Sequence, residues 1–313
     1  EEAAQIPAPG APRSRPRTVA RTDRHRSMAS SCSAGPASAM SWPIAVTKTS
    51  QAWRLRRVAG VSSAPARARM RKIKQIGIAL CFASFGALCM MGNLLFLPVA
   101  LLRLNRIGAV RNFVRDFIMI SWRIFLLLAR LYGSIGVSWR CKLPPSGTLI
   151  IANHPSLLDV VIFLAHVRRA NCVVKESLCK NPFLSAAIAA AGYIPNTGSE
   201  AMIDACRSAL ARGESLIIFP EGTRTADRIV MHKAAFYIAI NFAKNINCVA
   251  IKMDPKSLKK GQVWYDTPEV RMKYNLYELC ALDLTGFEPD RPNPIRVRKL
   301  YEKISNLYEK ENL

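Results

Sequence analysis

An uncharged apolar segment constrains the fold of this chain more than any other feature. No residue from Gln75 to Leu102 carries a charge, and about 20 such residues suffice to cross the hydrocarbon core of a bilayer. Both flanks are basic, with Arg71, Lys72 and Lys74 before the segment and Arg103, Arg106 and Arg111 after it. Because both flanks are basic, the positive-inside rule does not predict which end of the helix faces the cytoplasm. The two basic flanks fit a membrane-spanning helix and a helix inserted in one leaflet equally well.

The following segment, residues 110–131, is rich in Ile, Leu, Phe and Trp. Its charged residues Asp116, Arg123 and Arg130 recur every seven positions, with Arg115 beside them, so they fall near one stripe of a helix. This pattern predicts an amphipathic helix that lies in the membrane interface. A buried core helix is the alternative.

The first 69 residues differ from the rest in composition. They are rich in Pro, Arg, Ser and Ala and show no hydrophobic periodicity, so a disordered or non-native N-terminal extension is expected before Met70. A transit peptide is the alternative, because the segment is rich in Arg and Ser and poor in acidic residues. The chain is therefore predicted to comprise an extension at 1–69, a membrane helix with an interfacial helix at 70–135, and an α/β domain at 136–313.

Within that last part, short apolar runs alternate with helical patterns, which indicates an α/β fold. Strands are expected at 148–152, 171–174, 215–218 and 247–253, and helices at 156–167, 182–191, 199–212, 232–243 and 294–310. The last helix is predicted to pack on the fold through an apolar stripe formed by Val297, Leu300, Ile304 and Leu307.

A histidine and an aspartate follow the first of these strands, in the motif Asn153-His154-Pro155-Ser156-Leu157-Leu158-Asp159. A helix is expected to start at Pro155, because proline is favoured at the first helical position. A residue before proline is pushed into extended geometry, which lets the His154 imidazole fold back to the Asp159 carboxylate. Such a pair is a general base oriented by a carboxylate. No Ser or Cys nucleophile has a suitable setting nearby, so direct transfer is favoured over a covalent intermediate.

A second polar motif, Phe219-Pro220-Glu221-Gly222-Thr223-Arg224, follows the strand at 215–218. Gly222 allows a positive φ in the turn. The guanidinium of Arg224 is suited to bind a phosphate or a carboxylate through two hydrogen bonds. The carboxyl ends of the two strands are expected to bring His154 and Arg224 to one sheet edge, where open α/β sheets bind their ligands.

These motifs resemble those of the PlsC-like glycerolipid acyltransferases, the lysophosphatidate and lysophospholipid acyltransferases. A third block agrees in order, with Lys175-Glu176-Ser177-Leu178, Asn181-Pro182-Phe183 and Ala191-Gly192-Tyr193-Ile194-Pro195. The blocks together span roughly residues 148–253, about a third of the chain. The resemblance implies a mixed open sheet flanked by helices, with an N-terminal membrane-anchoring helix pair.

By this resemblance, His154 is the general base that takes the proton of an acceptor hydroxyl, and Asp159 orients it. The hydroxyl oxygen then attacks the carbonyl of a fatty acyl thioester, acyl-CoA or acyl-carrier protein, and no metal or redox cofactor is required. A helix start at Pro155 would add a positive dipole end for the oxyanion. The implied substrate-binding residues, which shape the second turn and hold the acceptor phosphate, are Glu221, Gly222, Thr223, Arg224 and Lys175.

The chain departs from the family pattern at Gly198, where the family usually carries an arginine that helps hold the acceptor phosphate. No Lys or Arg occurs between Lys180 and Arg207. The acceptor therefore stays open between lysophosphatidate or another lysophospholipid and a different alcohol, such as an aminolipid, a glycolipid or a polyketide-like acceptor. A non-catalytic lipid-binding protein is a third hypothesis, which the intact His154 and Asp159 disfavour.

The charge balance fits a protein that works at a membrane surface. The chain carries 45 Lys and Arg against 21 Asp and Glu, a formal net charge of +24, which suits anionic lipids or an acidic acyl-carrier protein. No nucleic acid is expected as a partner, because the basic residues are not interleaved with stacking aromatics. By family analogy, the expected location is the bacterial inner membrane with the catalytic domain on the cytoplasmic side.

The cysteines and isolated histidines predict no metal site. The nine cysteines form no C-x-x-C pair, which favours free thiols in a reducing compartment. His166 and His232 each lack a ligand or carboxylate partner at matching spacing, so both are assigned packing or surface roles.

Overall fold

The computed structural model describes residues 49–225, 229–258 and 270–311, with residues 49–68, 70 and 71 described by their backbone alone. The chain divides into two compact units, Glu1–Leu55 and Arg56–Leu313, and the second contains the whole sheet. Most of the predicted N-terminal extension thus lies outside the described residues.

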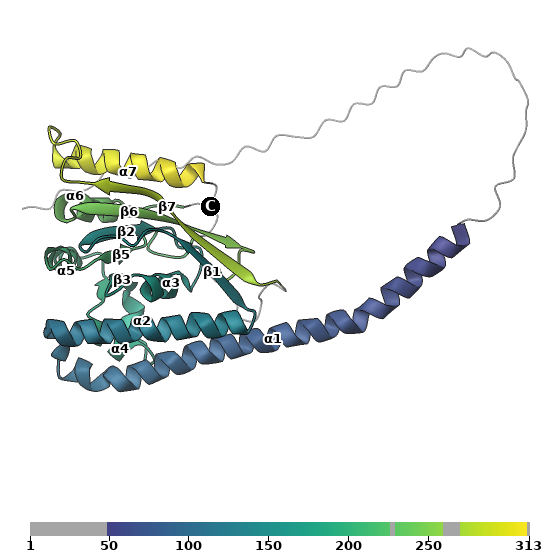
Figure 1. The fold of residues 1–313 in the computed structure, drawn as a ribbon. Coiled ribbons are helices and arrows are strands. Elements are labelled where there is room, and N and C mark those ends of the chain that lie inside the picture. Colours follow the sequence, from purple (N-terminus) through teal and green to yellow (C-terminus); the bar gives the residue numbers. More distant parts are fainter. Residues whose placement is uncertain (1–48, 226–228, 259–269, 312–313) are drawn as a thin grey trace, which may run out of the picture. The chain divides into compact units, whose positions relative to one another are not determined.

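In the described residues, seven strands form one mixed sheet in the order β1-β7-β6-β2-β5-β3-β4 (Figure 1). Neighbouring strands are parallel except for β6 and β7, which are antiparallel. The central strand β2 is buried along its whole length, as is usual for a strand covered on both faces. The strands are β1 (Ile135–Arg140), β2 (Thr148–Ala152), β3 (Asn171–Lys175), β4 (Ile194–Asn196), β5 (Leu216–Ile218), β6 (Asn245–Asp254) and β7 (Met272–Asp283).

Helices cover both faces of this sheet. The helices are α1 (Thr49–Leu101), α2 (Gly108–Leu131), α3 (Asp159–His166), α4 (Ser185–Ala191), α5 (Glu200–Ala211), α6 (Lys233–Phe242) and α7 (Asn293–Lys310), with 3-10 turns η1 (Leu104–Arg106) and η2 (Glu176–Lys180). One hydrophobic core lies between the sheet and α1 to α4, and the other between the sheet and α5 to α7. Successive residues of β2 enter different cores, Ile150 the first and Ile151 the second, which is the period-two alternation of a strand.

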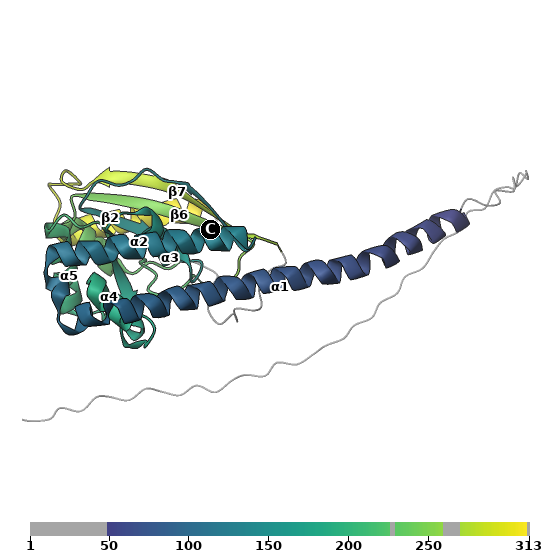
Figure 2. The ribbon, with the colours of Figure 1, turned by 60° about the horizontal axis from the view of Figure 1, so that its bottom comes forward.

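Helix α1 contains the uncharged segment. Its stretch Lys72–Leu101 is long and apolar enough to cross a membrane, by length and composition alone, and is the single such helix in the described residues. The C-terminal part of α1 runs beside α2 along one face of the fold (Figure 2). Aromatic pairs join them: Phe85 stacks on Trp122 and Phe96 meets Phe117 edge-on, each pair with ring centroids 5.3 Å apart.

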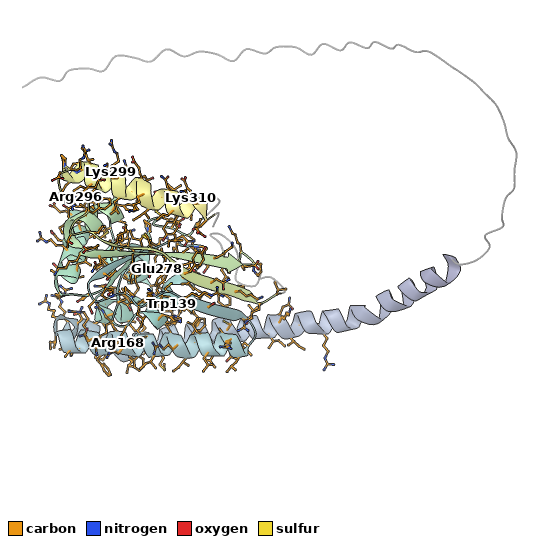
Figure 3. All side chains as sticks on the ribbon, turned by 45° about the horizontal axis from the view of Figure 1, so that its top comes forward. Trp139, Arg168, Glu278, Arg296, Lys299 and Lys310 are labelled. Carbon is orange, nitrogen blue, oxygen red and sulfur yellow. The ribbon has the colours of Figure 1, made fainter. Side chains whose placement is uncertain are left out.

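Three charged side chains of α2 bind other elements of the protein, although only Arg115 among them is buried. Arg115 is 2 % exposed, and its Nε donates to the carbonyl of Ala191 at the end of α4. Arg123 Nε donates to the carbonyl of Ala165 in the last turn of α3. Asp116 accepts hydrogen bonds from Arg168, which is labelled in Figure 3, and from Arg169, and both arginines follow α3.

The predicted helix at 110–131 is thus confirmed as α2. Its place in the membrane interface stays a prediction, and Arg115, Asp116 and Arg123 each bind a neighbouring element of the fold. The last carbonyls of a helix have no intrahelical partner, and the arginines of α2 satisfy those of α3 and α4. The side of α2 that faces outward is apolar instead, with Phe113, Ile120, Ile124, Leu127 and Leu131 exposed.

Most other expected elements are confirmed within two residues, including β2, β3, β5, β6, α5, α6 and α7. The sequence analysis missed β1, β4 and β7, and the antiparallel β7 is what makes the sheet mixed. Two helices start three residues later than predicted, α3 at Asp159 and α4 at Ser185.

Candidate active site

The candidate site lies where two neighbouring strands end. Strands β2 and β5 are parallel and in register, so the segments that follow them leave the sheet at the same edge. Asn153 fixes the first exit: its Nδ2 donates to the carbonyl of Ile251 (3.0 Å) and its Oδ1 accepts the Ile251 N–H (2.7 Å). This buried pair of hydrogen bonds ties the backbone just before His154 to β6.

His154 and Asp159 are joined as the sequence predicted. His154 Nδ1 lies 2.9 Å from Asp159 Oδ2, and the aspartate is fully buried while the imidazole is 17 % exposed. The ring of Phe219 lies against the imidazole at a centroid distance of 4.5 Å. An ionised Asp159 holds the proton on Nδ1, so Nε2 is the nitrogen that can accept a proton.

The turn between these two residues differs from the prediction. The Asp159 carboxylate folds back over it, and its two oxygens accept the N–H and the hydroxyl of Ser156, each at 2.7 Å. Helix α3 therefore starts at Asp159 and not at Pro155, because the carboxylate binds groups that a helical first turn would leave free. The oxyanion site expected at Pro155 is likewise wrong, since the Ser156 N–H is occupied and proline has none.

Two supporting residues had not been identified as part of the site. Ser156 is fully buried, and its Oγ accepts a hydrogen bond from the hydroxyl of Tyr274 on β7 (3.0 Å). Burial raises the pKa of Tyr274, so the phenol keeps its proton and donates. A chain of hydrogen bonds thus runs from Tyr274 through Ser156 and Asp159 to His154.

We expect the members of this chain to differ in importance. Ser156→Ala removes a hydrogen bond to a buried carboxylate and should lower the free energy of unfolding by about 1.5–3 kcal/mol. Tyr274→Phe leaves that bond intact and should cost about 1 kcal/mol. Urea unfolding of both variants, beside their transfer rates, tests this order. A larger loss from Tyr274→Phe than from Ser156→Ala would contradict it.

Glu221 joins the two motifs to each other. Its Oε1 accepts the backbone N–H of His154 and the hydroxyl of Thr225, each at 2.8 Å, and the Thr225 N–H donates to the His154 carbonyl (2.7 Å). Burial raises the pKa of the Glu221 carboxyl above its ordinary value, although these hydrogen bonds oppose the change. These contacts fix the backbone at His154.

A cavity of about 770 Å³ extends from His154. Most of its wall is apolar and comes from both cores, including Phe85, Phe96, Trp122, Val161, Ile188 and Ile203. Its polar lining residues gather around the second motif: Lys175, Asn196, Glu221, Thr223 and His232, with Gly198 and Gly222 beside them.

The structure thus brings His154, Glu221, Gly222, Thr223 and Lys175 to one cavity, with Asp159 behind His154. Arg224 is not among the described residues that line it.

Instead, Arg224 Nη1 donates to the carbonyl of Leu258 (2.8 Å).

Gly222 has φ 64°, as predicted for the turn. His166 packs on Trp139 as a stacked ring, as expected. His232 is exposed, as a surface role predicts, and it also lines the cavity.

Two comparisons place the chain among known proteins. The Acyltransferase family model matches residues 135–254, which contain both motifs. The 1-acyl-sn-glycerol-3-phosphate acyltransferase of Helicobacter pylori is 35 % identical over 171 residues, which cover 52 % of this chain and 68 % of that protein. The chain belongs to the acyltransferase family.

A solved structure supports the fold of this acyltransferase. The crystal structure of the 1-acyl-sn-glycerophosphate (LPA) acyltransferase PlsC from Thermotoga maritima matches it with a TM-score of 0.54 at 21 % identity, over 77 % of this chain and 98 % of that one. The expected mixed α/β sheet flanked by helices is thereby confirmed.

Proposed function

We propose that this acyltransferase moves a fatty acyl group from an acyl thioester, acyl-CoA or acyl-carrier protein, to the hydroxyl of lysophosphatidate or another lysophospholipid. The observation that carries the proposal is the 2.9 Å hydrogen bond from His154 to the buried Asp159, beside a largely apolar cavity. A base that is oriented in this way activates a hydroxyl, and the cavity accommodates a hydrocarbon chain.

The proposed reaction is a direct transfer. His154 Nε2 takes the proton of the acceptor hydroxyl while the hydroxyl oxygen attacks the thioester carbonyl carbon. Asp159 stabilises the resulting imidazolium. The C–S bond of the tetrahedral intermediate then breaks, and the sulfur leaves as a thiol with the proton from Nε2. The steps use two substrates and no further group.

The acyl chain is proposed to lie along the apolar part of the cavity. Phe85 of α1, Trp122 of α2 and Ile188 of α4 line this part, so three helices contribute to it. Each methylene removed from water contributes about 0.8 kcal/mol, which makes chain length a determinant of binding.

We further propose that α1 and α2 bind the protein to a membrane. Both present large exposed apolar side chains, among them Ile76, Leu80, Met90, Leu94, Leu97, Ile120, Ile124, Leu127 and Leu131. A surface of this kind marks an interaction site, and its basic flanks suit anionic lipid headgroups. The inner membrane with a cytoplasmic catalytic domain is the proposed location, and protease protection in oriented membrane vesicles tests it.

The full chain in mixed micelles, with labelled acyl-CoA and acyl-carrier-protein donors, tests the activity. The acceptors are lysophosphatidate, other lysophospholipids and lyso-aminolipids, and His154→Ala is assayed in parallel. Transfer to a lysophospholipid that depends on His154 is expected. Transfer to a lyso-aminolipid alone would select the second candidate function, which Gly198 favours. Folded protein without any His154-dependent transfer would contradict both.

A further inference from the structure

Four polar side chains at the polar part of the cavity have no partner in the described structure. Lys175 ends β3, Asn196 ends β4, Thr223 lies in the second motif, and His232 immediately precedes α6. In the described residues, none of these side chains makes a hydrogen bond or an ion pair. Polar groups that converge on a cavity from four segments, and that have no partner among the described residues, are suited to hold a ligand.

Two of these groups converge on Gly222. A Cβ atom added to Gly222 would lie 3.7 Å from His232 Nε2 and 4.0 Å from Asn196 Nδ2. The two nitrogens are therefore no farther apart than the sum of these two distances, a span that one phosphate bridges with a hydrogen bond of about 2.9 Å at each end. A single tetrahedral anion with several oxygens is able to reach both.

The described lining carries one cationic side chain, Lys175, and one carboxylic acid, Glu221, so an anion there would be held mainly by hydrogen bonds. Lys175 is the single Lys or Arg among the described residues that line the cavity. Arg224 donates to Leu258, and Gly198 contributes no side chain. Side-chain donors of Asn196, Thr223 and His232 are therefore available for the remaining contacts.

We propose that His232 and Asn196, together with Thr223 and Lys175, bind the phosphate of the lysophospholipid acceptor. The proposal rests on the proposed function and adds two specificity-determining residues that lie outside the sequence motifs. A phosphate monoester and a phosphodiester both offer oxygens to this set. The phosphate would lie over Gly222, near the base that deprotonates the acceptor hydroxyl.

The test compares acceptors that differ in the phosphate. We would measure kcat and KM for lysophosphatidate, lysophosphatidylglycerol and monoacylglycerol of equal chain length, with His232→Ala and Asn196→Ala. Each variant is expected to lower kcat/KM for the phosphate-bearing acceptors about 10- to 100-fold, mainly through KM, because it removes a hydrogen bond to a charged group. Transfer to monoacylglycerol should change less than about twofold, because that acceptor has no phosphate to lose.

Two controls separate binding from folding. His232→Asn keeps a side-chain donor and should recover most of the affinity. Thr197→Ala alters the exposed neighbour of Asn196, whose hydroxyl bonds Ser199, and should leave all three acceptors unchanged.

Binding of radiolabelled lysophosphatidate to His154→Ala protein, with and without His232→Ala, measures affinity without turnover. Failure of the proposed function, with no transfer by the unaltered protein, therefore leaves this measurement informative. Weaker binding of lysophosphatidate by the double variant supports the proposal. The acceptor with the larger loss of kcat/KM, lysophosphatidate or lysophosphatidylglycerol, shows whether the site prefers a phosphate monoester or a phosphodiester. Unchanged binding, or equal losses for monoacylglycerol and the phosphate acceptors, overturns it.

Discussion

His154→Ala is expected to lower kcat about 10²- to 10⁴-fold with KM for either substrate little changed, because it removes the proton acceptor and leaves the cavity in place. Asp159→Asn should be nearly as severe. An amide cannot hold the proton on Nδ1 as a carboxylate does, so the imidazole can present the wrong nitrogen to the acceptor.

Initial rates with a labelled thioester donor, measured on protein of verified fold, test both variants. His166→Gln is the matched control, because His166 is a second histidine that stacks on Trp139 away from the cavity. Its transfer rate should stay within about threefold of the unaltered protein, since it touches no reacting group. Retention of more than a tenth of the activity by His154→Ala would remove the general base from the mechanism.

Glu214→Ala is expected to destabilise the fold by about 3–5 kcal/mol, the largest stability effect we anticipate. The Glu214 carboxylate lies 3.0 Å from Arg115 Nη1 and 3.0 Å from Arg111 Nη2, and it also bonds Arg212 (2.9 Å). The Arg115 side chain is only 1 % exposed. Its guanidinium would therefore stay charged and buried without a counter-ion.

The same carboxylate makes stability depend on pH. Burial raises the pKa of Glu214, but hydrogen bonds from Arg212 and Arg115 outweigh it and hold the pKa below the ordinary value of 4.5. An acid with a depressed folded-state pKa stabilises the fold above its unfolded pKa and loses this contribution as the pH falls. Glu214→Gln should thus flatten the loss of stability below about pH 4.5.

Urea unfolding at pH 7 and pH 4 measures both effects. Glu176→Gln is the control, because Glu176 is about half exposed and pairs with Lys180 on the surface. It should cost less than about 1 kcal/mol. A loss of unfolding free energy in Glu214→Ala that is no larger than the loss in Glu176→Gln would show that Arg115 finds another partner.

Part of the fold could be predicted because burial leaves a direct mark on sequence. Strand β2 is covered on both faces and therefore reads as an uninterrupted apolar run, Thr148–Ala152. Helix α7 packs on one side only, so its apolar residues Leu300 and Ile304 recur at helical spacing. The His154–Asp159 pair was predictable for a related reason, since both residues belong to one short motif with a local geometric constraint.

The remaining features depend on contacts between distant segments. Tyr274 joins the site because β7 pairs with β6 and with β1, and no local pattern relates residue 274 to Ser156. Asn196 and His232 approach each other only where β4 and the start of α6 flank Gly222. The orientation of α2 was unpredictable for the same reason, because its arginines bind carbonyls of α3 and α4.

Arginines of α2 bind the carbonyls of α3 and α4, and residues of both α1 and α2 line the cavity. The two N-terminal helices are therefore part of the folded domain and not a membrane anchor that can be removed without effect. A protein shortened to start after Tyr132 would lose Phe85 and Trp122 from the cavity and leave Glu214 without Arg115. Trimming to gain solubility would then remove part of the cavity wall proposed to hold the acyl chain, together with the apolar surface. Polar replacements at the outward positions Ile120 and Leu127 offer the better route, because these side chains are exposed and are not among the described residues lining the cavity.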